Sequence, residues 1–195
     1  MPNFLILAND LALDFVNTEV ILAGVPTDLL QSLADLTEWF EKAGLAPGSA
    51  MRRLAVDWGE TGEARRATEA ARDLRHTLRK SAARVANSGS VSVGLAAVLN
   101  DLLQDPRLAT EVLYSQGRLK TSPRWVLNKP HDLIVPVAHH AANFFATADY
   151  SAVRKCENPD CILYFYDTSK NHSRRWCSMD LCGNRAKVSA FRQRH

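Results

Sequence analysis

Apolar residues recur at intervals of three and four over most of residues 1–150, and this period predicts a mainly helical N-terminal domain. Asp10 is suited to cap a first helix, which is expected to extend through Leu22 before Gly24 and Pro26 end it. The same period, interrupted by glycine and proline, predicts further helices over residues 29–40, 61–85, 91–103 and 132–150.

One segment of this domain departs from the helical period. Short apolar runs at residues 111–114, 118–120 and 125–127 are separated by Gly117 and Pro123, a pattern typical of strands joined by tight turns. The sequence therefore predicts a small β-hairpin within the otherwise helical domain.

After residue 150 the pattern changes to that of a small module. The Cys-x4-Cys segment at 156–161 indicates a knuckle, residues 162–166 a strand, and residues 174–176 a returning strand. Ser178 is suited to cap a helix that continues to the C-terminus. Knuckle, hairpin and helix form a treble-clef-like arrangement. Its own small core is predicted to contain Phe165, Trp176, Leu181, Val188 and Phe191.

All four cysteines of the chain lie in this module, with the spacing Cys-x4-Cys-x15-Cys-x4-Cys. Two close pairs of thiolates can surround one ion, and Zn²⁺ takes four sulfur ligands tetrahedrally at about 2.3 Å. Four sulfurs leave no position for water or substrate, so we expect a structural zinc ion that stabilises a segment too small to fold alone. The expected ligands are Cys156, Cys161, Cys177 and Cys182.

Two disulfides or an iron–sulfur cluster are the alternatives to zinc. The N-terminus has no basic segment and only five consecutive apolar residues before Asn9, so it does not resemble a signal peptide. We therefore expect a cytoplasmic protein, in which paired cysteines are more often metal ligands than disulfides. No apolar run approaches the length that spans a bilayer.

The charge of the chain is unevenly distributed. The net charge is +3 overall, with nine Lys and Arg against four acidic residues in 154–195, and fifteen against seventeen in 1–153. A basic zinc module on a slightly acidic body indicates a polyanionic partner, most simply nucleic acid, with DNA favoured over RNA. The alternative is a solvated basic tail that keeps the protein soluble.

Seven side chains of the module are candidates for nucleic-acid contacts. Arginine forks just before the helix suit phosphates, and Asn and Arg side chains can read adenine and guanine edges in a major groove. The phosphate candidates are Arg174, Arg175, Lys187, Arg192 and Arg194, and the base-reading candidates are Asn184 and Arg185.

A helical wheel complicates this assignment. Leu181, Val188 and Phe191 form one stripe that is expected to be buried, and cations lie on both sides of it instead of on a single opposite face. Asn184 and Arg185 lie close to the stripe. In the alternative interpretation Asn184 fixes the knuckle backbone, and Arg185 pairs with an acid such as Asp167 or Asp180.

The N-terminal domain offers a weaker candidate site. Asp10, Asp14 and Asn17 share one face of the first predicted helix, and Asp14 and Asn17 in particular could line a polar ligand pocket. The alternative is a solvent-facing stripe. His139 and His140 point in two directions, so at most one faces any cavity. Trp39 and Trp58 are expected in the core. No nucleotide-binding, metalloprotease or serine-hydrolase motif is present, so no enzyme is indicated.

Two motifs of the sequence resemble known families. Trp176-Cys-Ser-Met-Asp-Leu-Cys-Gly-Asn-Arg185, which follows Cys-x4-Cys and Tyr-Phe-Tyr-Asp, resembles the CGNR zinc finger. Leu13-Asp-Phe-Val-Asn-Thr18 is similar to the signature of the ABATE domain that usually precedes this finger. The resemblance covers the whole chain and divides it into an ABATE-like domain, residues 1–150, and a finger, residues 151–195. It implies a bacterial stress-induced transcriptional regulator whose finger binds nucleic acid.

Three functions follow from these observations. The first is a regulator that binds nucleic acid through the zinc module and responds to a small molecule in the N-terminal domain. The second makes the zinc module a structural or protein-docking element, with the function in the helical domain. The third is an enzyme acting in an N-terminal pocket, and it has the least support because no catalytic residue set is visible. The sequence does not indicate the oligomeric state.

Overall fold

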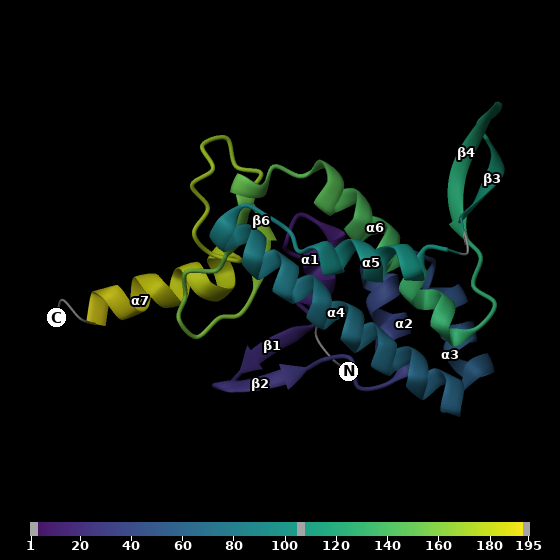
Figure 1. Ribbon diagram of the computed structural model, residues 1–195, viewed down its shortest axis with the longest axis horizontal. Helices are drawn as coiled ribbons and strands as arrows, with labels where there is room; N and C mark the ends of the chain where they lie inside the picture. The colour runs from purple at the N-terminus through teal and green to yellow at the C-terminus, as the bar shows by residue number, and fades with distance from the viewer. Residues whose placement is uncertain (1–3, 105–107, 193–195) are drawn as a thin grey trace.

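The computed structural model describes residues 4–104 and 108–192, so Arg194 lies outside the described residues. Of the seven α-helices in these residues, six pack around a core to which both ends of the described chain contribute, and the seventh extends outward; the described residues also form three separate two-stranded sheets. This confirms a mainly helical N-terminal region with a small hairpin, followed by a C-terminal zinc module (Figure 1).

The first predicted helix is shorter than expected. Helix α1 covers only Leu11–Val16, and the chain then forms a β-hairpin from β1, Glu19–Leu22, and β2, Val25–Asp28. The cap prediction was correct, because Asp10 accepts hydrogen bonds from the amides of Ala12 and Leu13. The helix ends early because Ala23 and Gly24 take left-handed turn conformations, with φ of 50° and 81°, which favour a tight hairpin.

The structure contains one helix that the sequence pattern did not indicate. Helix α2, Leu33–Lys42, is followed by α3, Gly48–Trp58, so the Pro47-Gly48 pair begins a helix in addition to ending the previous segment. Met51 is the one side chain of α3 that is buried, which leaves little apolar periodicity to detect. Trp39 is fully buried as expected, whereas Trp58 lies at the edge of the core.

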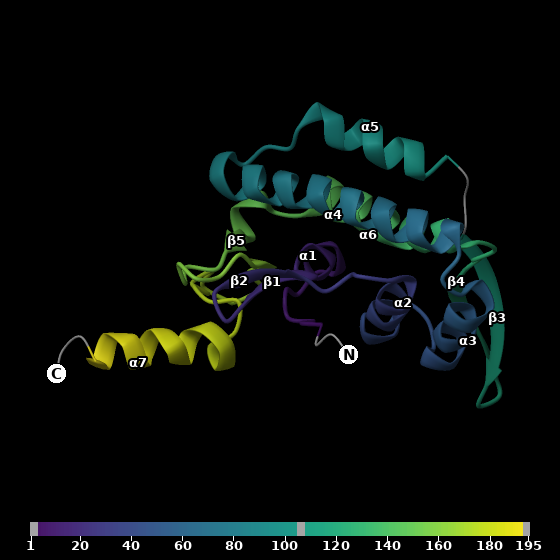
Figure 2. The same ribbon diagram turned by 90° about the horizontal axis from the view of Figure 1, so that it is seen from below.

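The long helix α4, Gly62–Ser88, is the central element of the fold. It packs against α1, α2, strand β5, Val153–Lys155, and helix α6, Ile134–Thr147 (Figure 2). Small alanines along its buried stripe allow these neighbours to approach closely. The stripe contains Ala64, Ala67, Ala71, Leu74, Leu78, Ala82 and Val85.

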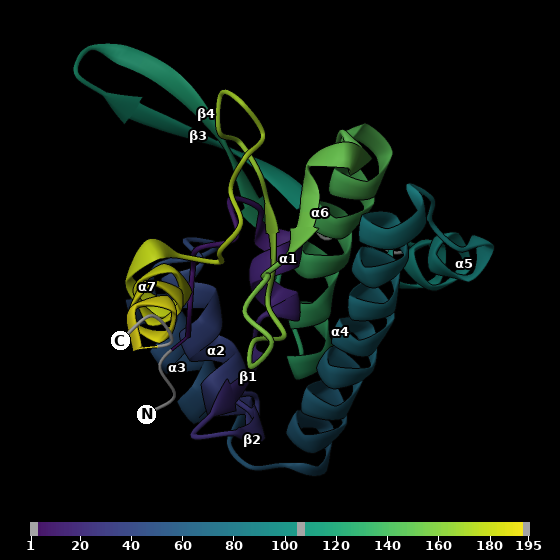
Figure 3. The same cartoon turned by 90° about the vertical axis from the view of Figure 1, so that its left-hand side faces the viewer.

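The predicted β-hairpin is confirmed and stands away from the body. Strand β3, Leu108–Ser115, pairs with β4, Arg118–Trp125, in an antiparallel register that closes at Ser115 and Arg118. Helix α5, Val93–Leu102, precedes it and packs on α4 and α6. Figures 1 and 3 show the hairpin projecting beyond the helices, so only its base lies against them.

The C-terminal module has a different hairpin from the one predicted. Strand β6, Tyr164–Tyr166, pairs with β5, Val153–Lys155, and residues 174–176 form no strand. The partner differs because the buried carboxylate of Asp167 accepts hydrogen bonds from the amides of Ser169 and Arg174, which folds that segment into a loop.

The last helix of the module also differs from the prediction. A single π-helical turn, Met179–Gly183, leads into α7, Asn184–Arg192, which extends away from the body (Figures 1 and 2). Phe165 is fully buried as expected, but Val188 and Phe191 are 51% and 60% exposed and take no part in the core of the module. The stripe is exposed because α7 runs outward instead of folding back on β6.

Candidate metal centre and basic helix

The four cysteine sulfurs form one compact, buried cluster. All four Sγ atoms lie within 4.8 Å of one another, with 3.9 Å between Cys161 and Cys177 and 3.5 Å between Cys177 and Cys182. A tetrahedral ion with bonds of about 2.3 Å requires its ligands to be separated by about 3.8 Å. The cysteines are free thiols, since a disulfide needs a sulfur separation of about 2 Å. The cluster therefore fits a single metal ion.

The surrounding chain supplies hydrogen bonds to the sulfurs. The backbone amide of Cys177 donates to Cys156 Sγ at 3.3 Å, and the Asn158 side-chain amide donates to Cys182 Sγ at 3.4 Å. Donors of this kind stabilise thiolates and fix their orientation toward a metal. Asn158 was not among the sequence-predicted residues, although an amide side chain inside the Cys-x4-Cys knuckle is a signal that could have indicated it.

The protonation of the cluster shows why a cation suits it. Hydrogen bonds from Cys161 and Cys177 lower the pKa of Cys156 to about 2, and the bond with Cys156 raises the pKa of Cys161 to about 12. Hydrogen bonds with Cys156 and Cys161 raise the pKa of Cys177. Four neighbouring thiolates repel one another, and a divalent ion removes that penalty by binding all of them.

Arg174 is directed into the protein. Its guanidinium donates to the carbonyl oxygens of Leu7 at 2.9 Å and Trp176 at 3.0 Å, and also to that of Cys177. The same group lies 4.3 Å from the ring centroid of Phe165. This predicted phosphate ligand thus uses its Nε and one terminal nitrogen to bind protein carbonyl groups, and it ties the loop before Cys177 to the N-terminal segment at Leu7.

Arg175, the next residue, faces the surface. Its Nε donates to Glu157 at 2.6 Å, and its guanidinium lies 5.0 Å from the ring of Trp176. The Arg175 side chain is nevertheless 63% exposed. Its guanidinium is therefore paired with Glu157 but still largely accessible beside the zinc knuckle.

The candidates on α7 are all on the surface. Asn184, Arg185, Lys187 and Arg192 are exposed. Among the described residues no ion pair forms at Arg185, and Asp167, one of its two predicted partners, is instead bonded to backbone amides.

Gly183, just before the helix, approaches Met179 and Trp176 so closely that a Cβ would lie 2.7 Å from Met179 Sδ.

Asp14 and Asn17 are buried, and each bonds to backbone. Asp14 accepts from the amides of Leu7 and Ala8 at 2.8 Å, while Asn17 both donates to and accepts from the backbone of Tyr164, at 2.8 and 3.0 Å. Neither lines any of the three cavities described for this structure. Asp14 connects α1 to the first residues of the chain, and Asn17 connects it to β6. In the structure both side chains make structural hydrogen bonds, whereas the sequence suggested that they could line a polar pocket.

Replacing Asp14 by Asn should make the protein less sensitive to pH. Burial raises the pKa of Asp14 to about 6, so the folded state holds its proton more tightly than the unfolded chain, and stability falls as pH rises between about 4 and 6. Asp14→Asn keeps an oxygen acceptor without the buried charge. As the pH rises from 5 to 7, the free energy of unfolding of the variant should increase relative to that of the wild type by about 1 kcal/mol. Urea denaturation of both proteins at each pH measures the gain, and a constant difference would contradict it.

The architecture is that of a helical domain joined to a four-cysteine zinc finger. Residues 152–195 match the family of the CGNR zinc finger, and the four cysteines bind one structural zinc ion. Residues 9–148 match the ABATE family, whose description is "Putative stress-induced transcription regulator". The chain belongs to the ABATE family. One description names a transcription regulator and the other a zinc finger, and neither names an enzymatic activity.

Two further observations complete the comparison. A search of curated proteins found no match to the chain. In the described part of the chain, no helix combines the length and apolar character needed to cross a membrane.

Proposed function

We propose that the protein is a transcriptional regulator that binds duplex DNA through α7 and the adjoining zinc knuckle. The observation that carries this proposal is the position of α7. The helix leaves the body of the protein and presents its cations to solvent at one end of the molecule (Figure 2).

The exposure of Val188 changes the meaning of the charge pattern on α7. At about 100° per residue, Arg185 and Arg192 lie on one side of Val188 and Lys187 lies on the other, all within roughly 160° of the helix surface. Because Val188 is exposed, these cations flank a surface stripe instead of a buried one. They therefore lie on one half of the helix.

Such a face suits the major groove of B-form DNA. The groove is about 12 Å wide and admits an α-helix, and an apolar centre can contact thymine methyl groups while flanking cations reach phosphates. The nine residues of α7 extend about 14 Å. In A-form RNA the major groove is too deep and narrow for side chains to read, which favours DNA.

The residues receive different roles in this proposal. Asn184 and Arg185 at the start of α7 would contact base edges, while Lys187, Arg192 and Arg175 would hold phosphates. Arg194 belongs to the same proposed set from its place in the sequence. Arg174 is omitted, since its guanidinium bonds to three carbonyl groups of the protein.

The N-terminal domain would make the regulator responsive to a small molecule. No catalytic step is assigned to it, in agreement with the non-enzymatic descriptions of both families. We place the regulator in the cytoplasm, where bacterial DNA is reached directly.

Removing two cations from α7 should weaken DNA binding and its dependence on salt. Lys187→Ala with Arg192→Ala removes two exposed cations, both assigned to phosphates, without disturbing the core. If each contacts one phosphate, the slope of log K against log salt should become shallower by roughly 2. The measurement is a salt titration of zinc-loaded protein on mixed-sequence duplex DNA, followed by fluorescence anisotropy.

The matched control is Arg65→Ala with Arg66→Ala, which removes two exposed arginines from α4. This control should bind DNA like the wild type. Absent or salt-independent binding by the wild type, or equal losses in the two double variants, would contradict the proposed function.

A second candidate has one specific observation in its favour. The zinc module shares its core with the helical domain, through residues such as Phe165 and Val153. A purely structural or protein-docking module would explain that arrangement without nucleic acid. It predicts that the α7 double variant leaves regulation in cells unchanged, whereas the DNA-binding function predicts its loss.

A further inference from the structure

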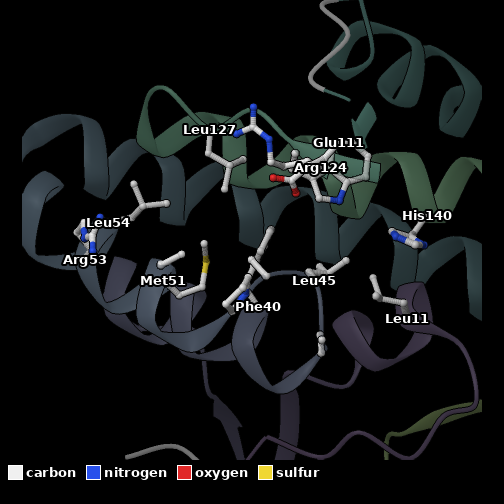
Figure 4. Close-up of a pocket in the computed structure, with 16 residues that line it drawn as sticks. Leu11, Phe40, Leu45, Met51, Arg53, Leu54, Glu111, Arg124, Leu127 and His140 are labelled. Carbon is white, nitrogen blue, oxygen red and sulfur yellow. The ribbon is translucent and has the colours of Figure 1, made fainter. Parts of the chain in front are cut away.

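The largest cavity described in the structure lies at the end of the molecule opposite α7. Its volume is about 1050 Å³, and it opens between the turn joining α2 to α3, the base of the β3–β4 hairpin and α6 (Figure 4). Pockets for small organic molecules usually measure about 300–1,000 Å³. The cavity can therefore accept a molecule of that size.

The floor of the cavity is apolar. Phe40, Leu45 and Met51 line it from the α2–α3 side, and Leu127 faces them from the chain that follows β4 (Figure 4). These four side chains offer a ligand apolar contacts and no strong hydrogen-bonding group. A ligand would bury apolar surface here, and each buried methylene strengthens binding by roughly fourfold.

The polar groups of the cavity carry a net positive charge. Arg53 of α3 and Arg124 of β4 contribute two cations, and Glu111 of β3 contributes one carboxylate. Among the described residues no ion pair joins Glu111 to either arginine. His140 of α6 also lines the cavity, and burial, followed by the neighbouring His139, lowers its pKa, so it is neutral at pH 7. The net charge is thus +1.

We infer that this cavity binds an apolar organic molecule that carries one anionic group, and that the cations Arg53 and Arg124, at separate places on its exposed rim, favour the anion over a neutral ligand. The inference rests on the proposed regulatory function, because it identifies the chemical class of the effector. The shared chemistry includes aliphatic and aromatic carboxylates.

Helix α1 connects this cavity to the zinc module. Leu11, at the start of α1, lines the cavity, and Asn17, just after its end, bonds to Tyr164 of β6. A shift of this short helix on ligand binding would therefore reach the module directly. The connection gives the site a route to the DNA-binding face.

Three probes test the inference by calorimetry on the full, zinc-loaded chain with no nucleic acid present. Octanoate and 2-naphthoate represent the aliphatic and aromatic carboxylates, and 1-octanol has the apolar chain without the charge. At least one carboxylate should bind, and octanol should bind roughly tenfold or more weakly than octanoate if the aliphatic acid is the ligand.

Two variants distinguish the effect of the cavity arginines on binding from the effect of the overall charge of the protein. Arg53→Ala with Arg124→Ala should weaken carboxylate binding by roughly tenfold or more and abolish the preference for the acid over the alcohol. Arg118→Ala, an exposed arginine at the tip of the same hairpin, should leave binding unchanged. Far-UV circular dichroism verifies that each variant is folded.

Failure of both carboxylates to bind would overturn the inference, as would equal affinity for octanol or unchanged binding by the double variant. Because no DNA is present, these outcomes are independent of the test of α7. Loss of DNA binding with intact carboxylate binding would contradict only the proposed function.

Discussion

Removal of zinc should unfold the C-terminal module and destabilise the helical domain with it. The four sulfurs are buried in one cluster, and structural zinc contributes folding free energy directly. The loss should extend beyond the module, because its side chains belong to the same core as those of α1, α4 and α6.

At least three hydrogen bonds connect the zinc module to the rest of the chain, and their loss would destabilise the helical domain. Asn17 bonds to the backbone of Tyr164, Arg79 of α4 donates to the carbonyl of Ile162 at 2.9 Å, and Arg174 donates to that of Leu7 at 2.9 Å. If the module unfolds, all three hydrogen bonds are lost, at about 1 kcal/mol for the neutral amide of Asn17 and about 1.5–3 kcal/mol for each bond from a charged arginine. A combined loss of about 4 kcal/mol lowers the melting temperature of a chain of this size by roughly 10 °C.

The measurement is thermal unfolding followed by circular dichroism, with and without a zinc chelator, and with Cys177→Ser. Zinc added back should restore the melting temperature of the wild type but not of the variant, whereas magnesium should restore neither. A helical transition that does not change on chelation would show that the two parts are stable independently of each other.

Replacement of Arg75 by Met should be the most destabilising single change on α4. The Arg75 side chain is 7% exposed and forms two hydrogen bonds to Asp28, at 2.5 and 2.6 Å, with a third to Thr18 at 3.2 Å. Burial alone would raise the pKa of Asp28, but the bonds from Arg75 outweigh burial and lower it. Arg75→Met leaves that carboxylate without its main partner, at a cost of about 3–5 kcal/mol.

Arg72 provides the matched control, because it lies one turn earlier on the same face of α4. Its Nε lies 3.2 Å from Asp28, and its side chain is 33% exposed. Arg72→Met should therefore cost clearly less than Arg75→Met in urea denaturation. Asp28→Asn should recover part of the loss in the Arg75 variant, since it removes the unpaired charge. Equal costs for both arginines, or no recovery, would contradict this account.

The ligand set of the zinc site could be predicted from spacing, because four cysteines in two close pairs admit few geometries. The neighbouring arginines could not be distinguished in the same way. Arg174 and Arg175 have identical side chains in adjacent positions, and only the folded loop shows that one bonds to Leu7 while the other faces solvent. Local sequence gives no signal for a contact with a residue 167 positions away.

The helices were predictable where their apolar stripes face the core, as in α4. The stripe on α7 has the same period, yet Val188 is exposed, because periodicity indicates that a face is apolar and not what covers it. The end of α1 was missed for a related reason. Residues 18–22 continue a helical pattern, but the turn at Ala23 and Gly24 and the buried pair of Arg75 with Asp28 favour a hairpin there.

The bond between Asn17 and Tyr164 has a consequence for how such proteins can diversify. The Asn17 amide pairs with both backbone groups of Tyr164, as a neighbouring strand residue would, and so completes the free edge of β6 with a side chain from the other family domain. The structure of the zinc module therefore depends in part on a residue that lies outside it. A recombination event that exchanged the module for another finger would separate this pair, so a functional chimera would have to inherit α1 together with the zinc module.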